Sequence, residues 1–175
     1  MSTQPEISDS ASCGALALLR IDKAADFAKI HSGFLRQDGV AASIPVLGDW
    51  NILLRLAAKD PESLKQLIEK RIRSVEGVKD FEAYNCEEIW TADSGSAEYK
   101  ASAYAILDVD SSSLSSLTAR LRTTTGVAES SVIDNGKKII LFLRGNSPRE
   151  IRKTVSDEIR PLRGVLRIKL LNAMY

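Results

Sequence analysis

Residues 47–56 read LGDWNILLRL, a short polar stretch that opens directly into an aliphatic run. Gly48 and Asp49 belong to the residue types that favour tight turns, and the run from Ile52 onward has the composition of a buried strand. The stretch therefore predicts a hairpin between two antiparallel strands. An antiparallel sheet is the starting point for interpreting the rest of the chain.

The strand after this turn has a counterpart 87 residues later, because Ile52–Leu54 aligns with Ile139–Leu141. The segment from Ala17 to Asp22 aligns with Ala105 to Asp110 at an offset of 88. Self-similarity at a fixed period predicts two copies of one unit of about 75 residues. Further pairs at the offset of 87 are Asp38-Gly39-Val40 with Thr125-Gly126-Val127, Asp60-Pro61 with Ser147-Pro148, and Glu76-Gly77-Val78 with Arg163-Gly164-Val165.

Each copy changes its hydrophobic period in the same order, which predicts strand, helix, strand, strand, helix and strand. The hydroxyls of Ser111–Ser113 are expected to cap the first helix of the second copy, and Ser147 and Glu150 to form a capping box on the second helix. Asp134-Asn135-Gly136 predicts a tight turn, because Asn and Gly tolerate positive φ. The expected strands of this copy are 103–109, 127–133, 139–143 and 166–170, and the expected helices are 114–121 and 147–162.

This order predicts an α+β fold of two tandem ferredoxin-like βαββαβ units, each with two helices on one face of an antiparallel sheet. The predicted organisation is a disordered leader at 1–12, a first unit at 13–90, a linker at 91–96 and a second unit at 97–175. Each unit leaves one sheet face bare, and burying that face contributes roughly 25 cal/mol per Å². The two sheets are therefore expected to pack as in a dimeric α/β barrel or to pair with a second chain, and we expect a homo-oligomer.

The composition is typical of soluble globular proteins, with 44% hydrophobic and 27% charged residues. No apolar run approaches the ~20 residues needed to cross a bilayer, and the start MSTQPEISDS does not resemble a secretory signal. A cytoplasmic protein without membrane contact is expected. Cys13 and Cys86 make neither a disulfide framework nor a metal site, and we interpret both as buried or half-buried small apolar residues.

Positive charge is concentrated in one segment. From 137 to 169 there are ten Lys/Arg against three Asp/Glu, a net +7, which leaves 14 against 20, or −6, for the rest. We interpret the cations of the last helix as a solvated face, and the alternative is a surface for an acidic protein or a nucleic-acid backbone. RNA-binding sheets of this topology stack bases on aromatic side chains, and the strands 103–109 and 139–143 offer only Tyr104 and Phe142. The cations of the last helix are Arg149, Arg152, Lys153, Arg160 and Arg163.

A βαββαβ unit with Gly-Val after its first helix, a Gly-Asp-aromatic-Asx-aliphatic turn and Gly-Val before its last strand resembles the ligand-binding domain of the Lrp/AsnC transcription regulators. The second copy keeps the framework, but its turn reads Asn135-Gly136-Lys137-Lys138. The resemblance implies a non-catalytic module without a cofactor, which binds a small effector such as an amino acid and forms oligomers. Family members carry an N-terminal helix-turn-helix domain, whereas only the short leader precedes the first expected strand here. Direct DNA binding is therefore not expected, and a DNA-binding paralogue is an expected partner.

By the same resemblance, effectors sit near the turn between the middle strands, which implicates Gly48, Asp49, Trp50 and Asn51. Asp49 can accept from an ammonium group, Gly48 allows close approach because it lacks a Cβ, and Trp50 offers apolar area with one N–H donor. Family members often have Asp where this chain has Asn51, so one carboxylate is missing. The alternative is a plain hairpin with Trp50 packed on a neighbouring helix, in which case the protein is a purely structural oligomer.

His31 is the single histidine of the chain. It lies four residues after Phe27 and three before Phe34, so it is expected on the apolar face of the first helix, in the core or at an interface. A metal site or a catalytic triad needs further ligands or partners, and no His/Cys/Asp cluster accompanies it. Because related barrel folds include haem enzymes and oxygenases, such an enzyme remains a further alternative.

Overall fold

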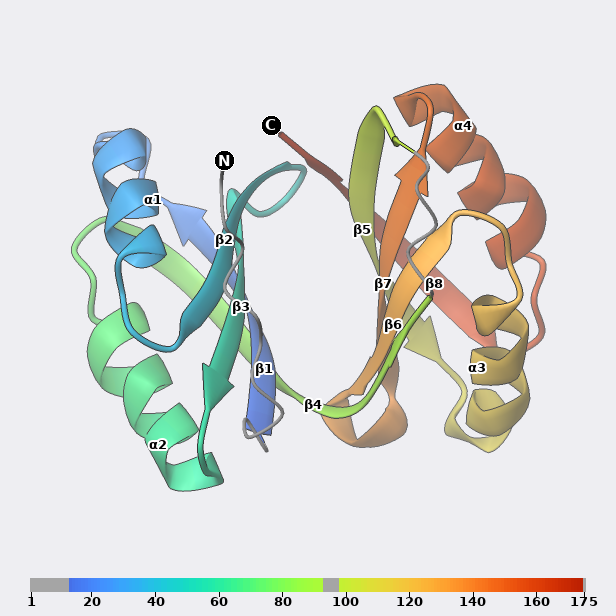
Figure 1. Ribbon diagram of the computed structural model, residues 1–175, viewed down its shortest axis with the longest axis horizontal. Helices are drawn as coiled ribbons and strands as arrows, with labels where there is room; N and C mark the ends of the chain where they lie inside the picture. The colour runs from blue at the N-terminus through green and yellow to red at the C-terminus, as the bar shows by residue number, and fades with distance from the viewer. Residues whose placement is uncertain (1–12, 93–97, 175) are drawn as a thin grey trace. The chain divides into compact units, whose positions relative to one another are not determined.

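The computed structural model describes residues 13–92 and 98–174. The expected leader at 1–12 and residues 93–96 of the expected linker lie outside the described residues. A mixed α+β fold is confirmed, and the order β-α-β-β-α-β occurs twice (Figure 1). The strands are β1 (Cys13–Ile21), β2 (Val40–Leu47), β3 (Ile52–Ala58), β4 (Val78–Thr91), β5 (Ala101–Val109), β6 (Val127–Ile133), β7 (Lys138–Gly145) and β8 (Val165–Ala173), and the helices are α1 (Phe27–Leu35), α2 (Pro61–Gln66), α3 (Leu114–Arg122) and α4 (Pro148–Lys153).

The chain forms two compact units, and the boundaries between them differ from the boundaries of the sequence repeat. Among the described residues, unit 1 contains 13–44 and 52–85, and unit 2 contains 45–51, 86–92 and 98–174. The end of β2, the turn after it and the end of β4 therefore belong to unit 2. This division follows the backbone pairing, because the end of β2 pairs with β8 and the end of β4 pairs with β6.

Unit 1 is an antiparallel sheet in the order β4-β1-β3-β2, with α1 and α2 on one face (Figure 1). The register of β1 against β3 runs from Cys13 opposite Ala58 to Leu19 opposite Ile52. Every second residue of these strands points to the helices, which produces the buried cluster between sheet and helices. Its fully buried members include Ala17, Leu19, Ile52, Leu54, Leu64 and Ile72.

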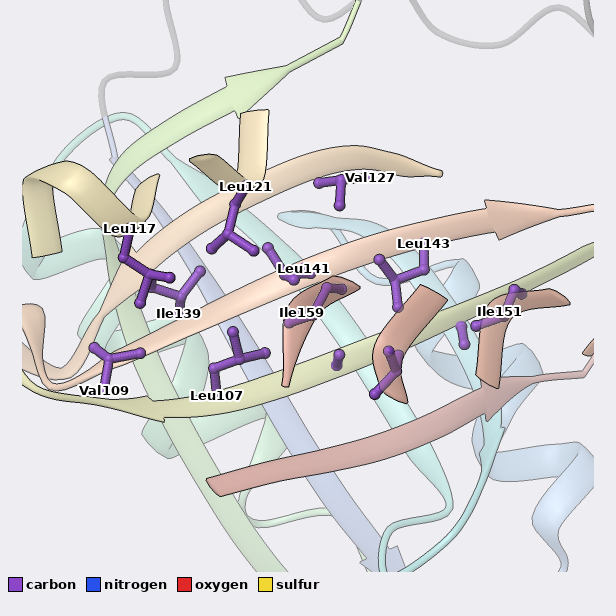
Figure 2. Close-up of a cluster of buried hydrophobic side chains, with 13 residues drawn as sticks. Leu107, Val109, Leu117, Leu121, Val127, Ile139, Leu141, Leu143, Ile151 and Ile159 are labelled. Carbon is purple, nitrogen blue, oxygen red and sulfur yellow. The ribbon is translucent and has the colours of Figure 1, made fainter. Parts of the chain in front are cut away.

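Unit 2 has the strand order β8-β5-β7-β6, with α3 and α4 on one face (Figure 1). The central pair β5 and β7 runs in register from Ala101 opposite Gly145 to Asp108 opposite Lys138. Figure 2 shows the core of this unit, in which alternate strand residues meet the buried faces of the helices. The labelled side chains are Leu107, Val109, Leu117, Leu121, Val127, Ile139, Leu141, Leu143, Ile151 and Ile159.

The side chains that cap the N-termini of the helices are carboxylates and, in α4, one hydroxyl. Asp60 accepts from the backbone N–H of Ser63 at 2.7 Å and from the Ser63 hydroxyl at 2.9 Å, and these two hydrogen bonds hold the pKa of Asp60 below its ordinary value of 3.8. Asp110 is held in the same way, since the backbone N–H and the hydroxyl of Ser112 lower its pKa. The prediction that hydroxyls of Ser111–Ser113 cap this helix was wrong, because the Asp110 carboxylate, a stronger acceptor, supplies the cap.

The predicted capping box of α4 is confirmed in one of its two hydrogen bonds. The Ser147 hydroxyl accepts from the backbone N–H of Glu150 at 3.2 Å. The Glu150 carboxylate accepts from the backbone N–H of Asn146 at 2.9 Å, which is one residue before the N–H that a capping box uses. The loop into α4 is thus fixed at two consecutive residues.

Both second helices continue as π-helical turns, η1 (Leu67–Ile72) after α2 and η4 (Thr154–Ile159) after α4. Each closes with a backbone hydrogen bond across five residues, from Arg73 to Ile68 and from Arg160 to Val155, both at 2.9 Å. These segments lie 87 residues apart, at the repeat offset. Such turns are rare, and both copies of the unit have one at the equivalent position.

Candidate functional site

The turn Gly48–Asn51 joins β2 to β3 and belongs to unit 2. The backbone N–H of Val46 donates to the carbonyl of Asn51 at 2.9 Å, which closes the hairpin. The turn lies beside the end of β8, because Val46 pairs with Ala173 in the antiparallel ladder. A hairpin at this position was predicted, but the strand next to it was not, since β8 lies more than a hundred residues away in the sequence.

Gly48 has a conformation and a neighbour that both require glycine. Its φ of +141° is unfavourable for any residue with a Cβ, and a Cβ built at this position would lie 2.8 Å from Cδ2 of Leu171 and 3.4 Å from the carbonyl oxygen of Leu170. The space that glycine leaves open is therefore filled by β8. In this structure the missing Cβ of Gly48 allows the turn to pack against β8.

Asp49 faces a cation from β8. Its Oδ2 lies 3.1 Å from Nζ of Lys169, and the two side chains are 63% and 41% exposed. The Asp49 carboxylate can accept from the ammonium of a free amino acid, and the Lys169 ammonium can donate to the carboxylate of the same ligand. The pair offers one charge of each sign, as a zwitterion does, and the sequence interpretation did not include Lys169.

The two remaining turn residues are less accessible than Asp49. Trp50 is buried, with 6% of its surface exposed, and Asn51 is half-buried. Trp50 therefore contributes apolar area to the base of the turn and little surface to a solvent-facing pocket. Of the four predicted residues, Asp49 is the one whose side chain is both charged and widely open to solvent.

A second concave region lies in unit 1, between α1 and the end of η1. It is a groove of about 770 Å³ whose lining includes the apolar side chains of Ile30, Phe34 and Val75. Its rim carries both charge signs, from Asp22, Asp26, Lys29, Arg71 and Glu76. An apolar base with a few polar groups is typical of small-molecule sites. The groove was not predicted, since its residues come from two segments with no shared motif.

His31 lies on the predicted apolar face of α1. Its ring stacks on Phe27 with the centroids 6.2 Å apart, and its Nδ1 lies 2.8 Å from the hydroxyl of Ser43, a buried residue of β2. Either group can donate, depending on the tautomer. The histidine thus satisfies a buried hydroxyl and joins α1 to the sheet, as expected for a core histidine.

Three other predicted features are placed as follows. The cations of α4 (Arg149, Arg152 and Lys153) and those that follow η4 (Arg160 and Arg163) are all exposed, as predicted for a solvated face. Cys86 is half-buried, and the side chain of Cys13 lies outside the described part of the chain. Among residues 13–92 and 98–174, no three His, Cys, Asp or Glu side chains gather in a way that could hold a metal ion, and no helix in these ranges is long and apolar enough to cross a membrane.

Comparison with solved structures shows the fold. The siroheme decarboxylase NirDL matches with a TM-score of 0.67 and 13% identity, over 93% of this chain and 71% of that chain. A putative monooxygenase from Lactobacillus acidophilus NCFM matches with a TM-score of 0.56 and 10% identity, over 93% and 92% of the two chains. An anthrone oxidase-like protein matches with a TM-score of 0.53 and 11% identity, over 95% and 94%. At these identities the likeness shows a shared fold and nothing further.

Comparison with curated protein sequences finds no match. The model of one protein family, described as the Lrp/AsnC ligand binding domain, matches residues 15–86. This range holds most of the first βαββαβ copy, and it includes the turn Gly48–Asn51 within its middle strands. The first copy is therefore similar to Lrp/AsnC ligand-binding domains in sequence, and the chain as a whole shares the mixed α+β fold of the structures above.

Proposed function

We propose that this chain is a regulatory module that binds a free amino acid and assembles with itself or with a DNA-binding regulator, without catalysis. The observation that carries the proposal is the match of residues 15–86 to a ligand-binding domain whose central turn holds Asp49, with Lys169 placed 3.1 Å away. An amino acid that enters between these side chains breaks the ion pair of Asp49 with Lys169 and forms one ion pair with each of them. Breaking the existing pair costs little, since exposed ion pairs contribute about 0 to 1 kcal/mol.

The mechanism that follows is linkage between binding and assembly. A ligand favours the assembly state that binds it better, and only by the difference between its affinities for the two states. Asp49 and Lys169 come from a turn and a strand that are paired in unit 2, so ligand binding changes the charge along the edge of β8. No bond of the ligand is made or broken.

The test is a thermal-shift screen of the purified protein against the twenty amino acids. An effector at a hundred times its dissociation constant adds about 2.7 kcal/mol, which corresponds to a rise in Tm of roughly 5–10 °C. Asp49→Asn should abolish the rise, and Asp38→Asn, an exposed carboxylate of the same copy, serves as the matched control. If no amino acid shifts the wild type, the effector proposal fails and a purely structural oligomer is the better description.

A second candidate is a tetrapyrrole-binding or oxygenase function, which is favoured by the backbone likeness to a siroheme decarboxylase over 93% of this chain. His31 is the single histidine available as an axial ligand, and its Nδ1 is engaged with Ser43. Addition of haem to the purified protein distinguishes the candidates. A Soret band that is lost in His31→Ala supports this candidate, and unchanged free-haem absorbance removes it.

A further inference from the structure

β4 and β8 each have a neighbouring strand on both sides in the strand order, but among the described residues the pairing on one side covers only part of each strand. β4 pairs with β1 along its first half, and its other side meets β6 only from Cys86 onward. β8 pairs with β5 along most of its length, and its other side meets β2 only at Asn172 and Ala173. The segments Val78–Ala83 of β4 and Val165–Lys169 of β8 thus present backbone groups that can extend a sheet, whereas Leu170 already lies beside the turn at Gly48.

These two edges carry opposite charges at equivalent positions of the repeat. Asp80 and Glu82 on β4 correspond, at the offset of 87, to Arg167 and Lys169 on β8. The side chains of Asp80, Arg167 and Lys169 are 46%, 78% and 41% exposed, and Glu82 is also exposed. The sheet face that Asp80 and Glu82 share is therefore acidic, and the face that Arg167 and Lys169 share is basic; Lys79, also exposed, precedes Asp80 on β4.

We propose that the β4 edge of one copy of this chain pairs antiparallel with the β8 edge of a second copy. One register satisfies both charge pairs at once, since placing Glu82 opposite Arg167 also places Asp80 opposite Lys169. Opposite charges that face each other across two strands are favourable, and two such pairs on one sheet face specify the register.

The apolar residues between these charges fit the same register. Phe81 then lies opposite Ile168, and each of them packs against the helix-covered core of its own unit. The helices of the two joined sheets therefore lie on the same side of the extended sheet, and the four charges lie on the other side. A pair of an aromatic and a β-branched residue is among the favourable cross-strand pairs.

Pairing of like edges is disfavoured by the same charges. Two β8 edges would bring Arg167 opposite Lys169, and two β4 edges would bring Asp80 opposite Glu82, which places like charges face to face. The acidic edge therefore selects the basic one, and the contact is head-to-tail. Such a contact builds a ring when its rotation closes and an open chain when it does not.

The present partners of these charges are exchangeable. Asp80 accepts from Arg20 at 2.7 Å, and Arg167 lies 3.8 Å from Asp108. Exposed pairs of this kind contribute little to the folded chain, so replacing them across a strand contact loses little. Lys169 belongs to both the turn site and the proposed contact, so a ligand carboxylate on Lys169 competes with Asp80 of the neighbouring copy. That competition rests on the proposed function, whereas the strand pairing does not.

The experiment is a charge swap read out by sedimentation velocity and light scattering. The wild type should form larger species as its concentration rises and as ionic strength falls. Glu82→Lys and Arg167→Glu should each weaken the contact about tenfold, because each sets like charges opposite one another. An equimolar mixture of the two variants should assemble again, since each mutated edge is complementary to the mutated edge of the other protein.

Matched controls and a second readout keep the outcome decisive. Glu158→Lys and Lys153→Glu, exposed residues of the last helix, change the net charge equally and should leave assembly unchanged. Amide hydrogen exchange of Asp80–Ala83 and Leu166–Lys169 should slow as the wild type associates. A wild type that stays monomeric at every concentration, or single variants that behave as the controls do, would overturn the pairing. Neither result bears on the amino-acid screen, which uses Asp49.

Discussion

Replacing Gly48 by alanine tests how tightly the turn is packed on β8. The backbone at φ +141° is strained for alanine, which costs about 1–3 kcal/mol. The new Cβ would lie 2.8 Å from Cδ2 of Leu171, the mobile end of a side chain, so the clash is relieved by a shift of that side chain and adds about 1 kcal/mol. Together these effects predict a loss of roughly 2–4 kcal/mol and a decrease in Tm of about 5–12 °C.

Gly33 provides the control. It lies within α1, its φ is not positive, and a Cβ there would meet no atom within 4 Å. Gly33→Ala should therefore raise stability by about 0.5–1 kcal/mol, because alanine is the better helix former. Thermal and urea unfolding followed by circular dichroism measure both variants. If Gly48→Ala is as stable as the wild type, or if it changes stability in the same direction as Gly33→Ala, the packing described for the turn is incorrect.

Three further predictions concern the scaffold. Ser147→Ala should lower stability by about 1 kcal/mol in urea unfolding, because the first turn of α4 loses its cap. Asp60 has a pKa lowered by its hydrogen bonds from Ser63, so its stabilisation is complete above its ordinary pKa of 3.8 and is lost as the pH falls through the lower folded value. The Tm of Asp60→Asn should accordingly fall by less between neutral and acidic pH than the Tm of the wild type does. An equal fall in both proteins would contradict the role of the Asp60 carboxylate as a cap. His31→Ala should cost about 1–3 kcal/mol in thermal unfolding, because the buried hydroxyl of Ser43 loses its partner, and Ser43→Ala combined with it should cost less than the sum of the single changes.

The element order could be predicted because it depends on local patterns that recur at one offset. The turn Asp134-Asn135-Gly136 has the positive φ at all three residues that its composition indicates. The π-helical turns were not predicted, since strictly helical spacing was assumed for the second helices. Ile151, Val155 and Ile159 recur at intervals of four and are all buried, but an α-helix shows the same spacing, so this pattern does not distinguish the two helix types.

The candidate site could be predicted only in part, because half of it comes from a distant strand. The turn residues are adjacent in sequence and share a recognisable pattern, whereas Lys169 reaches Asp49 only through the pairing of β2 with β8. The role of Gly48 was also beyond the sequence, since Leu171 fills the space that its missing Cβ leaves. The sequence shows which side chains the turn carries, whereas the pairing of β2 with β8 determines which side chains lie next to the turn.

Isothermal titration calorimetry of the amino acid with the largest thermal shift tests the central claim most directly. The account predicts saturable binding to the wild type, loss of binding in both Asp49→Asn and Lys169→Gln, and unchanged binding in Arg71→Gln, whose side chain lines the groove of unit 1. Binding that survives both turn variants, or that is lost in Arg71→Gln, would contradict the assignment of the effector to the Gly48–Asn51 turn.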